Sequence, residues 1–277
     1  LLPRPLAGHP SPRAPGTVLR HLYLFAYFHR FGGELDDSLS FDPFAGQDQR
    51  RAAGYHEGMR HPWPYTPDTV AVKLVQSAID IVTRDAPVVL RAWQTYRQAA
   101  AGGRGAGHAH TGRATRALQS ASAGFADAQS PVRSVRELVL RTDLLYASCF
   151  AVISYLVGPR VSEILHLKAG CVQRRCADGA GEPVTVIVGA IFKRQSGYHG
   201  RAHEWVAPPA AVQAVAVLEA LSAGHRAVAG RDELWLRRWH GNGATEWHEV
   251  RPELLEIPSI ARINIQLQRF AAWLGLA

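Results

Sequence analysis

The fold is decided by residues 152–172, which read VISYLVGPRVSEILHLKAGCV. The first part is almost wholly apolar and ends at Gly158 and Pro159, which predicts a buried helix that stops at a turn. Arg160 follows, and a second helix is expected to begin there. An arginine held at the end of a rigid element suits anion binding, because its charged fork grips phosphate or carboxylate with two bonds. Glu163 lies about one helical turn further and can brace this arginine.

A β-hairpin with a basic tip is predicted downstream of this corner. Residues 183–191 are rich in β-branched side chains and are expected to form one strand, and residues 204–209 close the second. The connection at 192–200 reads FKRQSGYHG, which places Lys193 near the tip of the hairpin.

Residues 158–167 (GPRVSEILHL) resemble the first arginine box of the tyrosine recombinases, the phage-integrase family. That box reads roughly Gly-x-Arg-x-Ser-Glu-(Ile/Leu)-x-x-Leu. In the family, a lysine on a hairpin follows the box at about the same distance in sequence as Lys193 follows Arg160. The resemblance covers residues 131–277, whereas residues 17–101 match only in being a helical region ahead of the catalytic one. The alternative interpretation is a helix–turn–helix corner whose arginine caps a helix or faces solvent.

The resemblance implies a reaction in which a tyrosine hydroxyl attacks a DNA backbone phosphate. A 3′-phosphotyrosine forms, a 5′-hydroxyl leaves, and a second DNA end reverses the step. Arg160 would clamp the non-bridging phosphate oxygens, Lys193 would protonate the leaving 5′-oxygen, and Glu163 would be structural support. Cations of the protein neutralise the transition state, so the resemblance implies neither a metal nor a small-molecule cofactor.

Two parts of the family's site are not assigned in the sequence. No His-x-x-Arg box follows Lys193 in a suitable context, and no tyrosine follows Tyr198, so we nominate no nucleophile in this chain. The helix expected after Ser259 resembles the one that precedes the missing box. The chain begins with Leu1 and its only methionine is Met59. We therefore expect a fragment of a recombinase that is inactive as written.

The predicted fold is mainly α-helical with a small antiparallel β-hairpin or sheet. Four segments are expected along the chain: a disordered N-terminal segment at 1–16, a helical core-binding-like domain at 17–101, a flexible linker at 102–130, and the N-terminal part of an α+β recombinase catalytic domain at 131–277. The spacing of apolar residues predicts helices at 17–31, from 68 to about 84, from 85 to about 101, at 135–157 and at 210–222, the last capped by Gly224.

The composition favours a polyanionic partner. The chain has 277 residues and a formal net charge of +8, and its sequence pI is about 9.8. We expect double-stranded DNA as the partner, with self-association on DNA as the family resemblance implies. Three cysteines suit a reducing compartment, so a cytoplasmic location is expected. The most apolar run, 144–157, is shorter than a bilayer span and is interpreted as a core helix, so no membrane contact is expected.

Two other functions stay open. The first is a catalytically inactive DNA-binding remnant of an integrase, or an accessory protein of a mobile genetic element. The second is a metal hydrolase that uses His199, His203 and Glu204. Two histidines at i and i+4 share a face only on a helix, and Gly197, Gly200 and the β-rich flanks argue against a helix there, so no metal site is expected.

Overall fold

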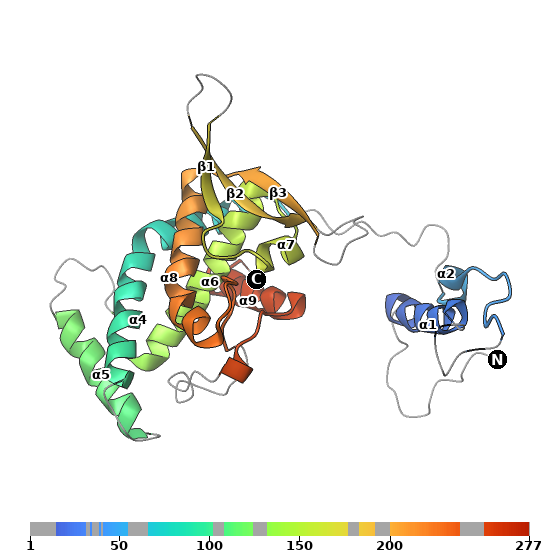
Figure 1. Ribbon diagram of the computed structural model, residues 1–277. Coiled ribbons are helices and arrows are strands. Elements are labelled where there is room, and N and C mark those ends of the chain that lie inside the picture. The colour runs from blue at the N-terminus through green and yellow to red at the C-terminus, as the bar shows by residue number, and fades with distance from the viewer. Residues whose placement is uncertain are drawn as a thin grey trace. The chain divides into compact units, whose positions relative to one another are not determined.

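The computed structural model describes residues 15–31, 34, 39, 41–54, 66–101, 108–123, 132–176, 183–191, 200–238 and 252–276. The chain divides into two compact units, Leu1–Tyr65 and Thr66–Ala277. The described part is mainly helical and carries a three-stranded antiparallel sheet, so the predicted fold class is confirmed (Figure 1). The boundary between the units lies at 65/66, whereas the sequence suggested one near 101; the assignment of 17–101 and 131–277 to particular domains stays a prediction. Residues 1–14 of the segment expected to be disordered lie outside the described residues.

The described residues of the first unit form two helices. Helix α1 (Pro15–Arg30) corresponds to the first helix predicted from the sequence. The short helix α2 (Gln49–Ala52) begins at Asp48, whose carboxylate accepts a hydrogen bond from the backbone N–H of Arg50 at 2.9 Å. Such a cap satisfies one of the donors that every helix start leaves unpaired.

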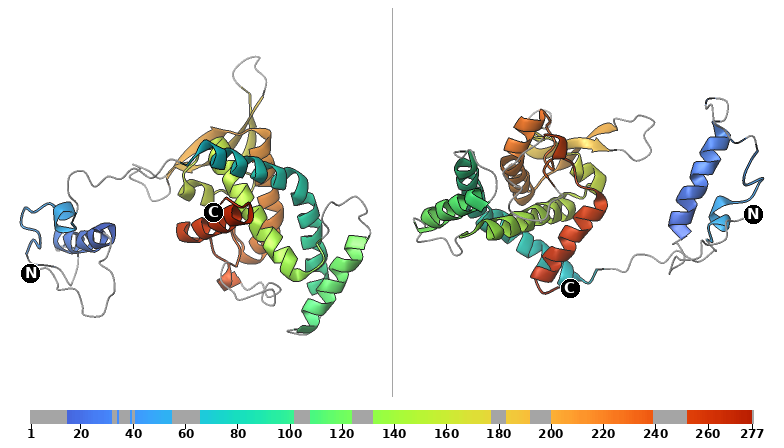
Figure 2. Two further views of the ribbon diagram at one scale, coloured as in Figure 1. Left: turned by 180° about the vertical axis from the view of Figure 1, so that it is seen from behind. Right: turned by 90° about the horizontal axis from the view of Figure 1, so that it is seen from below.

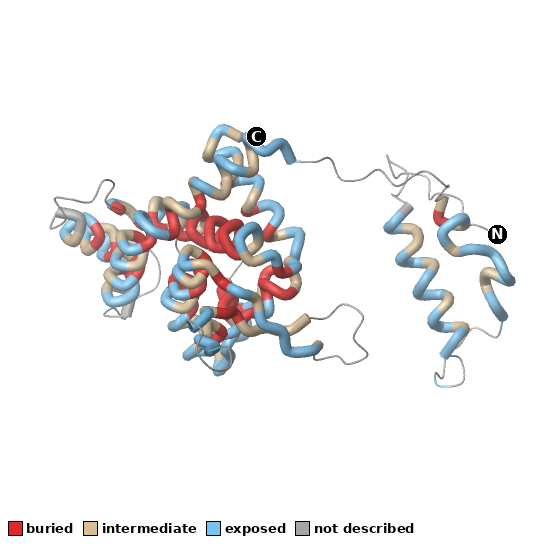
Figure 3. Tube along the Cα trace, turned by 90° about the horizontal axis from the view of Figure 1, so that it is seen from above, coloured by how far each residue is buried: buried red, intermediate tan, exposed pale blue. Residues whose placement is uncertain are grey.

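The second unit is built around helix α6 (Val135–Val157), whose residues are largely buried (Figure 3). Ser134 begins the helix by accepting a hydrogen bond from the N–H of Glu137, and Gly158 ends it in the left-handed conformation at φ 83°. By length and composition alone α6 could cross a membrane, but 67% of its most apolar window is buried inside the unit. Burial of this kind is typical of a core helix. Helix α6 packs mainly against α3 (Asp68–Asp80), α4 (Ala86–Ala101), α8 (Pro209–Ala229) and α9 (Ile260–Trp273) (Figure 2).

Helices α3 and α4 are joined without a loop by a single π-helical turn, Ile81–Asp85. Beyond α4, helix α5 (His108–Ala123) lies in the stretch that the sequence predicted to be a flexible linker at 102–130, and the structure differs from the prediction there. The glycine-rich composition hid a helical pattern: Ala114 and Leu118 lie four residues apart, and both are only 1% exposed. This pair gives α5 an apolar seam that packs on α4.

The sheet confirms the predicted antiparallel hairpin and adds a third strand. Strand β2 (Val184–Ile191) pairs with β3 (Arg201–Val206) over six residue pairs that end with Ile191 opposite Arg201. Strand β1 (Val172–Arg175) pairs with the other edge of β2. The sequence analysis missed β1 because its four residues, VQRR, show no alternation of apolar and polar side chains.

Helix α8 is longer than predicted. It runs to Ala229 and ends at Gly230 with φ 61°, so Gly224 lies inside the helix and is not its cap. Gly224 lies beside the guanidinium of Arg97 from α4, which would have to shift if a Cβ atom were added. The predicted cap of the last helix is confirmed, because the Ser259 hydroxyl accepts a hydrogen bond from the N–H of Arg262 at the start of α9.

Candidate functional site

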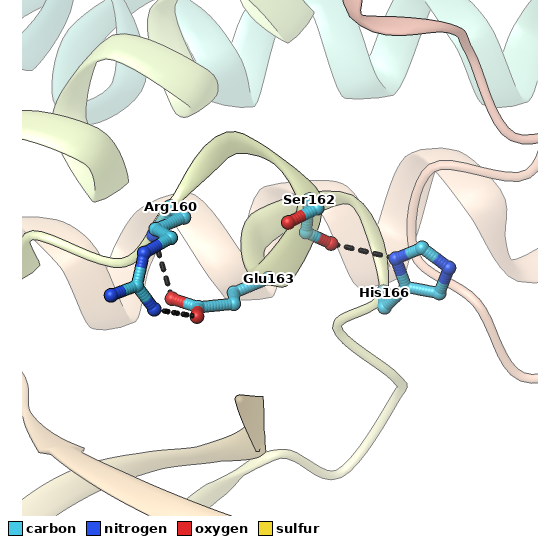
Figure 4. A network of polar contacts seen from close by, with 4 residues as sticks. All are labelled: Arg160, Ser162, Glu163 and His166. Atoms are coloured by element: carbon cyan, nitrogen blue, oxygen red, sulfur yellow. Dashed lines mark hydrogen bonds and ion pairs between the residues drawn. The ribbon is translucent and has the colours of Figure 1, made fainter. Parts of the chain in front are cut away.

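The candidate site is the corner that links the buried helix α6 to the short helix α7 (Val161–Leu165) (Figure 4). Gly158 turns the chain through the left-handed region, which few other residues adopt without strain. Pro159 is buried, and Arg160 then has an extended backbone at φ −69° and ψ 156°. Helix α6 is continuously buried from Leu144 to Ile153, and the corner follows one helical turn later, after the exposed Tyr155.

Arg160 and Glu163 are joined by two short contacts. One carboxylate oxygen of Glu163 accepts from the backbone N–H of Arg160 at 2.7 Å, and the other pairs with its guanidinium Nη1 at 2.6 Å (Figure 4). Glu163 is 3% exposed, whereas the Arg160 side chain is 54% exposed. One nitrogen of the fork is therefore fixed by a nearly buried carboxylate, and the side chain still reaches solvent. The structure thus places Glu163 where the sequence predicted a brace.

His166 occupies the exposed end of helix α7. Its Nδ1 lies 2.6 Å from the carbonyl oxygen of Ser162, one turn earlier (Figure 4). Since a carbonyl only accepts, Nδ1 is the protonated nitrogen in this contact. No role for His166 is predicted from the sequence.

Helix α7 is too short to be stable alone, and a segment far along the chain fixes it. The indole Nε1 of Trp235 donates to the carbonyl oxygen of Ile164 in α7 at 2.8 Å. The backbone N–H of Leu234 donates to the carbonyl of Leu167 at 2.9 Å, and that of Ala169 donates to Asp232, also at 2.9 Å. These hydrogen bonds tie residues 232–235, which we call the strap, to α7 and the residues that follow it.

Buried polar and aromatic contacts fix the strap and the neighbouring Arg237 against helix α6. Trp235 is fully buried, and its ring centroid lies 5.9 Å from that of Tyr146 and 5.8 Å from that of Phe150 on α6. Arg237 pairs with Asp143 at 2.8 Å, and its guanidinium carbon lies 4.7 Å from the Tyr146 ring centroid. Burial raises the pKa of Tyr146 to about 12 despite the nearby Arg237, so its hydroxyl stays protonated at neutral pH.

The sequence does not predict these contacts and assigns no role to Trp235, Arg237 or Asp143. The available signal was weak: a tryptophan and an arginine two residues apart in an otherwise short strand. Their partners lie 71 and 94 residues away in sequence, a separation at which local periodicity carries no information.

Lys193, the third predicted site residue, lies outside the described residues. Strand β2 ends at Ile191 and β3 begins at Arg201, and these two residues face each other. Lys193 lies between these two residues in the sequence, and its place near the hairpin tip stays a prediction. The structure brings Arg160 and Glu163 together and leaves the relation of Lys193 to them a prediction.

The geometry of β3 does not provide the histidine pair that a metal hydrolase needs. His203 and Glu204 are neighbours on a strand, so their side chains leave on opposite faces. Glu204 is engaged by Arg175 at 2.7 Å, and the hydrogen bonds from that guanidinium lower the pKa of the carboxyl. His199 lies outside the described residues. Among the residues that the structure describes, no group of three or more histidine, cysteine or carboxylate side chains is arranged to hold a metal ion.

No protein family, curated protein or solved structure matches this chain. The function is therefore inferred from its residues and their geometry.

Proposed function

We propose that this chain is part of a tyrosine-type, site-specific DNA recombinase and that it binds double-stranded DNA through the corner at Arg160. The observation that carries the proposal is the pairing of an exposed arginine with a nearly buried glutamate at the end of a core helix. A carboxylate in this position orients the guanidinium and leaves its remaining N–H groups for an anion. Two further features support the same proposal: the net positive charge of the chain, and the β-hairpin that follows the corner.

In this proposal Arg160 holds the non-bridging oxygens of one DNA phosphate. The charge on these oxygens grows as the phosphorus becomes five-coordinate, so a fixed cation stabilises the transition state more than the ground state. Lys193 donates a proton to the 5′-oxygen as it leaves. Glu163 does not react and keeps the arginine fork oriented. The parent protein acts in the cytoplasm and self-associates on DNA, with neither metal nor organic cofactor.

We nominate no attacking tyrosine in this chain. No tyrosine follows Tyr198, although the family's nucleophile lies C-terminal to the hairpin. Tyr96 and Tyr146 are buried, and burial raises their pKa values to about 12, so these two phenols have no access to a phosphate. Tyr23, Tyr27 and Tyr155 are exposed, but all three precede the arginine corner. The second candidate function is a DNA-binding integrase remnant or accessory protein that does not cleave DNA.

The test is duplex binding as a function of salt. A fluorescently labelled duplex of about 30 base pairs is titrated with the chain at several salt concentrations, and anisotropy gives the affinity. We expect the logarithm of the affinity to fall linearly with the logarithm of salt, by about 0.9 for each phosphate contacted. Absence of duplex binding at low salt would refute both functions.

A second assay tests whether this chain contains the nucleophile. Incubation with a nicked suicide substrate should give no covalent protein–DNA adduct with this chain. An adduct on denaturing gels would show that a tyrosine in this chain is the nucleophile, and our assignment of the reactive groups would then be wrong.

A further inference from the structure

We draw no further inference here: the strongest candidate, the surface patch of exposed apolar side chains on helix α1 (Tyr23, Leu24, Phe25, Tyr27 and Phe28), carries none because nothing in the structure shows what covers it.

Discussion

Replacing Trp235 by Phe tests whether the strap fixes the arginine corner. The substitution removes the indole N–H that donates to the carbonyl of Ile164 at 2.8 Å. It also shortens a fully buried side chain that contacts Tyr146 and Phe150. Both losses fall on the link between α6 and α7, and neither touches the surface of the unit.

The expected loss of stability has two parts. The carbonyl of Ile164 still accepts from the N–H of Leu167 at 3.2 Å, so it is not left without a partner, and the lost hydrogen bond costs about 1 kcal/mol. The missing ring volume, on the order of 40 Å³, adds about 1 kcal/mol at roughly 24 cal/mol per Å³ of cavity. We therefore expect the free energy of unfolding to fall by about 2 kcal/mol. That is a large share of the 5–15 kcal/mol typical of a domain.

The assay is urea unfolding followed by circular dichroism at 222 nm, because tryptophan fluorescence would change with the substitution itself. Trp273→Phe is the matched control: this tryptophan is 55% exposed, and its loss should cost less than about 0.5 kcal/mol. If Trp235→Phe and the control lose the same stability, the strap does not hold the corner as described.

Two further predictions concern the core of the second unit. Burial, with the nearby Arg237 and Arg97, lowers the pKa of His225 from 6.5 to about 4. Between these two pH values, His225 binds a proton in the unfolded chain but not in the folded chain. Stability should fall as the pH drops from about 6.5 to about 4, and His225 should account for about 2 kcal/mol between pH 7 and pH 5 in urea unfolding. Gly189→Ala should lower the free energy of unfolding by about 1–3 kcal/mol, since its Cβ would lie 2.9 Å from the Trp205 ring.

Each of these predictions has a control within the chain. The variant His225→Gln should show a shallower loss of stability on acidification than the wild type; equal pH profiles would mean that His225 is not buried in a neutral form. Gly112→Ala in helix α5 meets nothing within 4 Å, so it should stabilise the chain by about 0.5–1 kcal/mol. The free energy of unfolding should therefore fall in Gly189→Ala and rise in Gly112→Ala. A stabilising Gly189→Ala would contradict the packing of Trp205 on β2.

The long helices and the hairpin were predictable because their signals are local. The cap of α6 at Ser134 and its end at Gly158 follow from side-chain chemistry within a few residues, and β2 is marked by consecutive β-branched side chains. The arginine corner was predictable for the same reason, since Arg160 and Glu163 are three residues apart.

The features that the sequence did not predict depend on distant partners. Gly224 was predicted as a helix cap, but it lies inside α8, beside the Arg97 side chain 127 positions earlier. Helix α5 was predicted as a linker because its apolar seam is only the pair Ala114 and Leu118 in a glycine-rich stretch, and this seam packs on α4. Arg237 pairs with Asp143, 94 residues earlier in the sequence, and only the fold shows this contact.

The most direct test of the central claim is the duplex affinity of Arg160→Gln beside that of Arg84→Gln. Both variants lose one positive charge from an exposed arginine that pairs with a carboxylate. If Arg160 holds a phosphate, its replacement should weaken duplex binding by roughly tenfold to hundredfold, the equivalent of about 1.5–3 kcal/mol for a charged hydrogen bond. Arg84→Gln should weaken it less than about threefold. Equal affinity of Arg160→Gln and the wild-type chain would contradict the claim that this corner binds DNA.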